Sequence, residues 1–110
     1  MRFSLKDFML VLTTVPDEKV GEKIAQRLLK ERLAACVTIS SASSSFFWWQ
    51  EKIAKEKEHI LFIKTKSALF PELEGILKDN HPYDVPEIIA LPLLEGSPEY
   101  LDWIKNETKS

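Results

Sequence analysis

Two stretches of the chain are apolar on both of their alternating sides. They are Phe8–Val15 and Glu58–Thr65. A strand with one side in water alternates apolar and polar residues, whereas a strand covered on both sides is apolar almost throughout. The pattern therefore predicts two central strands, and both sides of each strand need a cover.

Three segments have the apolar spacing of amphipathic helices. The first follows Asp17, a residue type that favours the N-cap position, and it repeats an apolar residue at every fourth position. The second is expected to begin at Ser67 and to end at Asn80. A third is expected to follow Gly96-Ser97-Pro98.

The segment between the first two helices predicts a strand, a break and a hairpin. Ala35–Ile39 alternates as a strand, and the serine-rich stretch 40–45 ends or kinks it. Glu51–Lys57 is expected to form the charged tip of the hairpin. The last strand is expected at Pro86–Pro92.

Aromatic residues fill both sides of the segment Phe46–Trp49. Two interpretations are open. The segment is an arm that packs on another copy of the chain, since aromatic residues are enriched at the centres of protein interfaces. Alternatively it is an internal strand, since large exposed apolar patches are rare on monomers. The difficulty of covering both sides within 110 residues favours the arm.

The predicted elements follow the order strand, helix, strand, strand, helix, strand and a final helix. In the ferredoxin-like split βαβ pattern, helices cover one face of a four-stranded antiparallel sheet. The expected fold class is α+β, a ferredoxin-like βαββαβ sandwich with an extended β-hairpin arm and an extra C-terminal helix. Residues 1–110 are expected to form one domain, with residues 1–7 as a loose lead-in. The second face of the sheet is then bare, and another subunit is its simplest cover.

Composition narrows the partners of the chain. A net charge of −2 and the lack of a basic block argue against nucleic acid and against an anionic membrane as partners. No apolar run approaches the roughly 20 residues of a membrane-spanning helix, so no membrane partner is expected. The single Cys36 has no disulfide partner within the chain, which fits a reducing compartment and a cytoplasmic location.

The stretch from His81 to Glu87 is a candidate site. It places an imidazole, a phenol and two carboxylates beside Pro82 and Pro86, which stiffen the backbone. The spacing alone favours a plainer interpretation, in which a helix ends at Asn80 and the prolines lead into a strand. Cys36 lies on the more polar side of its strand, and a free cysteine is more often a small buried apolar residue than a functional one.

No catalytic constellation is evident in the sequence. It places no nucleophile beside a base, and the segment Thr13–Asp17 lacks the arginine and glycines of a phosphate cradle. An enzymatic function is therefore not expected.

Several motifs, in matching order and spacing, resemble the CutA divalent-cation tolerance family. The motifs are Thr14-x-Pro16, Arg32-Leu33-Ala34-Ala35-Cys36-Val37, Ser45-x-Phe47-x-Trp49, Lys64-Thr65, His81-Pro82-Tyr83-x-x-Pro86-Glu87-Ile88 and Tyr100-x-x-Trp103. They span roughly residues 8–104, nearly the whole chain. A joint match of several motifs is far more specific than a match of one.

The resemblance implies a tight homotrimer, similar in shape to PII signalling proteins, and an association with copper and other divalent metal ions. Animal relatives are linked to the anchoring of an enzyme. No cofactor is obligatory, and copper or another divalent cation is the expected ligand. The positions that match the family's proposed metal ligands are Cys36, His81 and Glu87. The residues expected at the trimer interface are Phe46, Phe47, Trp48, Trp49, Tyr100 and Trp103.

The function expected from this resemblance is that of a trimeric divalent-cation tolerance protein that binds copper or other divalent ions. The alternative is a non-catalytic, PII-like signalling or scaffold trimer that acts through protein or small-ligand binding. The chain departs from the family pattern in the arm. It has Thr38, Ser41-Ala42, Phe47 and Glu51 where the family usually has Asn, Pro-Gly, Tyr and Gly. Glu51 in place of Gly puts the usual hairpin turn in doubt.

Overall fold

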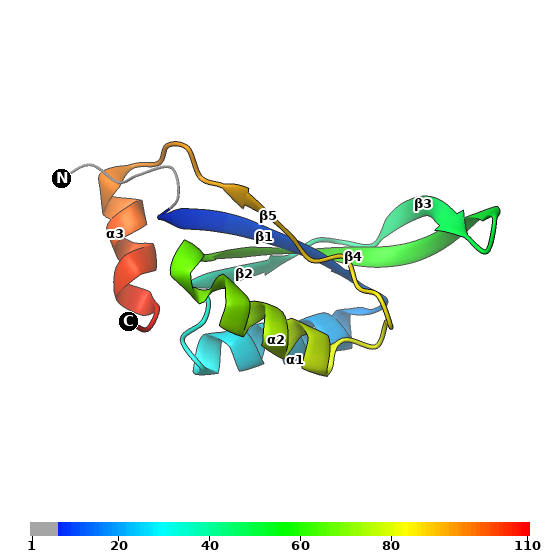
Figure 1. The fold of residues 1–110 in the computed structure, drawn as a ribbon, viewed down its shortest axis with the longest axis horizontal. Coiled ribbons are helices and arrows are strands. Elements are labelled where there is room, and N and C mark those ends of the chain that lie inside the picture. The colour runs from blue at the N-terminus through cyan, green and yellow to red at the C-terminus, as the bar shows by residue number, and fades with distance from the viewer. Residues whose placement is uncertain (1–6) are drawn as a thin grey trace.

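A sheet, with helices on one face, makes up most of the molecule (Figure 1). The computed structural model describes residues 7–110, so the predicted lead-in lies outside the described residues except for Asp7. The strands are β1 (Phe8–Val15), β2 (Cys36–Ile39), β3 (Ser43–Trp49), β4 (Lys52–Lys66) and β5 (Ile89–Pro92). The helices are α1 (Glu18–Lys30), α2 (Phe70–Asn80) and α3 (Pro98–Glu107), and a 3-10 turn at Ser67–Leu69 precedes α2.

The strand order is that of the ferredoxin-like pattern. β4 lies between β2 and β1, and β1 pairs with β5 on its other side. All of these pairings are antiparallel. Helices α1 and α2 lie side by side on one face of the sheet (Figure 1). The predicted α+β fold class is therefore confirmed.

The hydrophobic core lies between the sheet and these two helices. Alternation along β1 and β4 turns Val11, Leu61 and Ile63 toward α1 and α2, and all three are fully buried. The helix residues that meet them are Ile24, Leu28, Leu73 and Leu77. Gly21 lets α1 approach the sheet closely, since a Cβ at this position would lie 3.3 Å from the Val15 side chain.

The opposite face of the sheet is only partly covered. It is formed by Leu10, Leu12, Ile60, Phe62, Ile89 and Leu91, which we name the open face. Helix α3 packs at one end of this face, where Leu101 and Ile104 contact Phe8. Farther along, Ile89 and Leu91 keep 50% and 46% of their surface exposed. Within the described chain, therefore, an apolar sheet face lacks a full cover.

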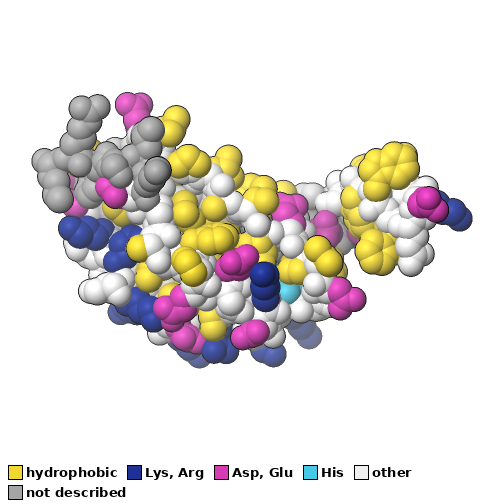
Figure 2. Space-filling model, viewed as in Figure 1, with side chains coloured by type: hydrophobic (Ala, Val, Ile, Leu, Met, Phe, Trp, Pro, Cys, Tyr) yellow, Lys and Arg dark blue, Asp and Glu magenta, His cyan; other side chains and the backbone are white. Residues whose placement is uncertain are grey.

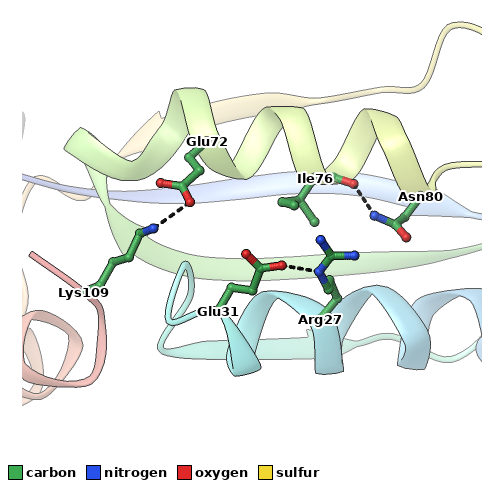
Figure 3. Close-up of polar contacts among 6 residues, drawn as sticks. All are labelled: Arg27, Glu31, Glu72, Ile76, Asn80 and Lys109. Carbon is green, nitrogen blue, oxygen red and sulfur yellow. Dashed lines mark hydrogen bonds and ion pairs between the residues drawn. The ribbon is translucent and has the colours of Figure 1, made fainter.

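The end of the chain is fastened to the body by polar contacts. The Lys109 amide donates to the Arg32 carbonyl at 2.9 Å. The Lys109 ammonium donates to Glu72 of α2 at 2.6 Å, while Arg27 of α1 pairs with Glu31, the residue that caps the end of that helix (Figure 3). These contacts hold α3 against the helical layer.

A hairpin of β3 and the first half of β4 stands away from the body (Figure 1). This arm stretches the molecule to 49 × 26 × 24 Å. Its turn has two residues, Gln50 and Glu51, with φ of 48° and 64°, as in a type I′ turn. The predicted charged tip at Glu51–Lys57 is therefore wrong beyond Glu51, because residues 52–57 pair with β3 as strand.

Two predicted boundaries also differ from the structure. Ser67 does not cap α2, because the 3-10 turn intervenes and Leu69 holds the N-cap position without a side-chain hydrogen bond. The last strand begins at Ile89 and not at Pro86. A proline has no amide hydrogen for the sheet ladder, so it suits the approach to a strand better than the strand itself.

Candidate functional site

His81 follows directly after α2 and is held between two backbone groups. Its Nε2 lies 2.8 Å from the Thr14 carbonyl oxygen, and its Nδ1 lies 3.2 Å from the Tyr83 amide. A carbonyl can only accept, so Nε2 carries the proton and donates, and Nδ1 accepts from Tyr83. Burial lowers the pKa of His81, against the opposing effects of the Thr14 carbonyl and Glu58. The ring is therefore neutral, and both of its nitrogens are occupied.

Tyr83 connects the same loop to the base of the arm. Its hydroxyl donates to Glu58 Oε2 at 2.8 Å, and Glu58 is only 6% exposed. Burial, together with the hydrogen bond and the charge of Glu58, raises the pKa of Tyr83 above its ordinary value. The loop thus fixes β4 at the point where the strand leaves the body and enters the arm.

Cys36 lies on β2, on the same side of the sheet as the open face. Its Sγ is 3.8 Å from Thr38 Oγ1, and Lys64 lies opposite it on β4. The Lys64 ammonium donates to the Tyr100 hydroxyl at 3.2 Å. That hydrogen bond raises the pKa of Lys64 and outweighs the opposing effect of desolvation. The thiol therefore lies opposite a lysine whose ammonium is bound to a phenol.

The three predicted metal ligands do not converge within one chain. Cys36 is opposite Lys64, whereas Thr14, which holds His81, is opposite Ile60. The two positions on β4 are four residues apart, or about 13 Å along the strand. Glu87 is exposed in the segment between α2 and β5. Among residues 7–110, no group of three or more His, Cys, Asp or Glu side chains is placed to hold a metal ion.

The six residues expected at the trimer interface are all exposed in the single chain. The exposed fractions are Phe46 66%, Phe47 38%, Trp48 74%, Trp49 61%, Tyr100 39% and Trp103 41%. Tyr100 and Trp103 lie together on α3, with ring centroids 5.4 Å apart. The interpretation of Phe46–Trp49 as an internal strand is therefore wrong for this chain, because its own body does not cover the arm.

Sequence reasoning missed the roles of Glu58 and Lys64. The pattern predicts Glu58 only as the start of a central strand and Lys64 only as part of a family motif. In the structure Glu58 is buried against Tyr83, and Lys64 donates to Tyr100. One signal was available. A half-buried tyrosine needs a partner for its hydroxyl, so Tyr83 in its stiffened loop pointed to a polar group nearby.

Fold and site together define a small ferredoxin-like α+β protein with an aromatic hairpin arm and an uncovered sheet face. A family model described as CutA1 divalent ion tolerance protein matches residues 9–107. The chain belongs to this CutA1 family.

Individual relatives agree with this assignment. The divalent-cation tolerance protein CutA of Thermus thermophilus is 48% identical over 99 residues, which cover 90% of this chain and 96% of that protein. The chloroplastic protein CutA of Arabidopsis thaliana is 42% identical over 93% of this chain, but the chain spans only 56% of that longer protein. The crystal structure of CutA1 from Oryza sativa has a TM-score of 0.92 and 41% identity, covering 97% of this chain and 99% of that chain.

Proposed function

We propose that the protein acts in divalent-cation tolerance as a homotrimer and without catalysing a reaction. The proposal of a homotrimer rests on the open face, where Ile89 and Leu91 remain about half exposed. Removing apolar surface from water stabilises by about 25 cal/mol per Å². A neighbouring subunit on this face therefore completes the core, and the family resemblance supports a total of three subunits.

The arm extends the same surface. β4 is one continuous strand, so its even-numbered residues, from Phe62 and Ile60 to Ala54, lie on the same side. Phe47 is opposite Ala54 in the β3–β4 ladder, and Trp49 is opposite Lys52. We name this side, formed by Phe47, Trp49, Lys52, Ala54 and Glu56, the inner arm face. A subunit that lies along the open face meets the inner arm face next.

Metal binding by Cys36, His81 and Glu87 is proposed to occur between subunits, because these residues are separated within one chain. A thiolate with an imidazole suits copper, and Cu²⁺ stands highest in the usual affinity order of divalent ions. Nδ1 of His81 becomes a ligand only if the Tyr83 amide releases it. Metal binding at His81 would therefore change the loop that holds Glu58.

A second candidate function is a PII-like signalling or scaffold trimer with no metal site. The observation that favours it is the full use of both His81 nitrogens by backbone groups. A histidine with two satisfied nitrogens suits a structural role. This candidate predicts the same assembly but no specific metal affinity. A cytoplasmic location remains part of either proposal.

The assembly is tested by light scattering on the purified, untagged protein. A trimer has a mass of about 38 kDa, three times the 12.7 kDa of one chain. Folding and assembly are expected to be inseparable, because the core is completed across subunits. A folded monomer at micromolar concentration would exclude the homotrimer.

Metal binding is tested by calorimetry with Cu²⁺ and Zn²⁺ on the wild type and three variants. Cys36→Ser and His81→Ala should weaken binding, and the wild-type affinity should fall as the pH drops, because protons compete for the thiol and the imidazole. His59→Ala is the matched control, since His59 lies opposite Val15 in the sheet and is bonded to the Ser40 carbonyl. Equal binding by all four proteins would indicate adventitious chelation and would favour the scaffold function.

A further inference from the structure

The second side of the arm carries the most exposed aromatic residue of the arm. It is formed by Phe46, Trp48, Ile53, Lys55 and Lys57, which the β3–β4 register places together, and we name it the outer arm face. Trp48 is 74% exposed, and Phe46 and Ile53 are 66% and 67% exposed. Figure 2 shows hydrophobic side chains on both sides of the arm, well away from the body.

We expect the proposed trimer to leave this side of the arm uncovered, so that Phe46 and Trp48, which the family resemblance places at the interface, lie outside it. The odd-numbered residues of β4 form the outer arm face, and in the body the same side is covered by α1 and α2 through Leu61 and Ile63. Both helices end before the arm begins (Figure 1). A subunit on the open face therefore covers the inner arm face and leaves the outer one in water.

The charges of the two arm faces differ. The outer arm face has two cations, Lys55 and Lys57, and none of its described strand residues is a carboxylate. The Lys55 ammonium lies 5.6 Å from the ring centroid of Phe46, beside the apolar group. Glu56 and Glu58 both point to the other side. Although the whole chain has a net charge of −2, this surface is complementary to an anionic partner.

We infer that the outer arm face docks on the surface of an anionic lipid membrane. Tryptophan and phenylalanine favour the boundary between headgroups and acyl chains, and lysines reach past apolar surface to the phosphates. A ribbon lying flat places Phe46, Trp48 and Ile53 in that boundary, to a depth of roughly 5–10 Å. Nucleic acid fits less well, because two cations neutralise few phosphates and Ile53 offers no ring for stacking.

This docking is peripheral. None of the helices in the described part of the chain is long and apolar enough to cross a membrane. The expectation of no membrane partner rested on the lack of a spanning segment and of a basic block in the sequence. A surface contact needs no spanning segment, and the β3–β4 register, which the sequence alone does not show, brings Lys55 and Lys57 together on one side of the arm. The inference rests on the proposed function only in that the trimer covers the inner arm face.

The test is co-flotation of the trimeric protein with vesicles, one set of phosphatidylcholine and phosphatidylserine and one of phosphatidylcholine alone. Wild type should float with the anionic vesicles only, and Trp48→Glu should not float. Lys55→Gln and Lys57→Gln should each weaken binding about fivefold, the effect of one lysine near an anionic surface. Lys23→Gln, at an exposed position of α1 and on neither arm face, is the control and should bind as wild type does.

Light scattering on each variant separates this inference from the proposed assembly. If the wild-type protein is a trimer but binds neither vesicle type, membrane docking is excluded and the proposed trimer is unaffected. Equal losses in Lys23→Gln and Lys55→Gln overturn the assignment to the outer arm face. Binding of a labelled single-stranded oligonucleotide that depends on Lys55 and Lys57, without vesicle binding, overturns it in favour of nucleic acid.

Discussion

Two buried threonines on the core side of the sheet differ in a single hydrogen bond. Thr13 and Thr65 are both fully buried. The Thr65 hydroxyl donates to the Leu33 carbonyl at 2.6 Å, whereas the Thr13 hydroxyl has no partner within residues 7–110. A buried polar group without a partner retains the full cost of its desolvation.

Valine has the shape of threonine without the hydroxyl, so it separates these two cases. Thr13→Val should raise the free energy of unfolding by about 1 kcal/mol, since it removes an unpaired group. Thr65→Val should lower it by about 1–2 kcal/mol, because the Leu33 carbonyl loses its donor. Urea unfolding at equal protein concentration measures both. Equal effects of the two substitutions would contradict the difference in hydrogen bonding.

The neutral state of His81 gives stability a defined pH dependence. Burial holds its folded-state pKa below the ordinary value of 6.5, so the unfolded chain binds the proton more readily. Stability from this residue is then complete above pH 6.5 and is lost as the pH falls toward the folded-state pKa. His81→Gln should lower stability at neutral pH and flatten the decline below it. Urea unfolding midpoints measured at several pH values in this range give the dependence of stability on pH. His59→Gln shows how much of that dependence comes from the other imidazole.

At the scale of the elements, periodicity predicted the body better than the arm. β1 and α1 were found from apolar spacing because each has a core to pack against. Residues 52–57 carry charges on both sides, since a two-stranded ribbon in solvent has no core to impose alternation. Their lack of periodicity therefore predicted a hairpin tip. Their strand conformation comes from pairing with β3, which the periodicity does not detect.

The candidate site shows a similar limit. The proline-stiffened loop was found from sequence, because prolines act locally. The separation of Cys36 from His81 depends on strand register and on the bond to Thr14, and the spacing along the chain encodes neither. The partners of His81 and Tyr83 lie 67 and 25 residues away in sequence, which no local pattern reveals.

The turn of the arm carries strain that substitution can relieve. Gln50 and Glu51 both have positive φ, which costs a residue with a side chain roughly 1 kcal/mol. Glu51→Gly, or Gln50→Asn with Glu51→Gly, should raise thermal stability by about 1 kcal/mol or more. Glu51→Ala keeps the strain and removes the charge, so it is the control and should not stabilise. Thermal unfolding followed by circular dichroism measures the three variants.

At the scale of the whole molecule, adjacent tryptophans should have opposite effects on assembly. Trp49 lies on the inner arm face, so Trp49→Ala should weaken the trimer, and it should lower stability by about 3–5 kcal/mol if the site is core-like. Trp48 lies on the outer arm face, so Trp48→Ala should leave the trimer intact. Light scattering over a dilution series compares the two. An unchanged trimer with Trp49→Ala would show that the inner arm face is not the interface.

The continuity of β4 has a mechanical consequence. One strand runs from the sheet to the turn, and Tyr83 contacts it at Glu58, so the arm can tilt as a unit about this contact. From Glu58 to Lys52 the strand rises about 20 Å, and a tilt of about 10° at Glu58 therefore displaces the tip by about 3.5 Å. Any ligand or substitution that loosens the grip of the loop on Glu58 is thus amplified at the far end of the molecule.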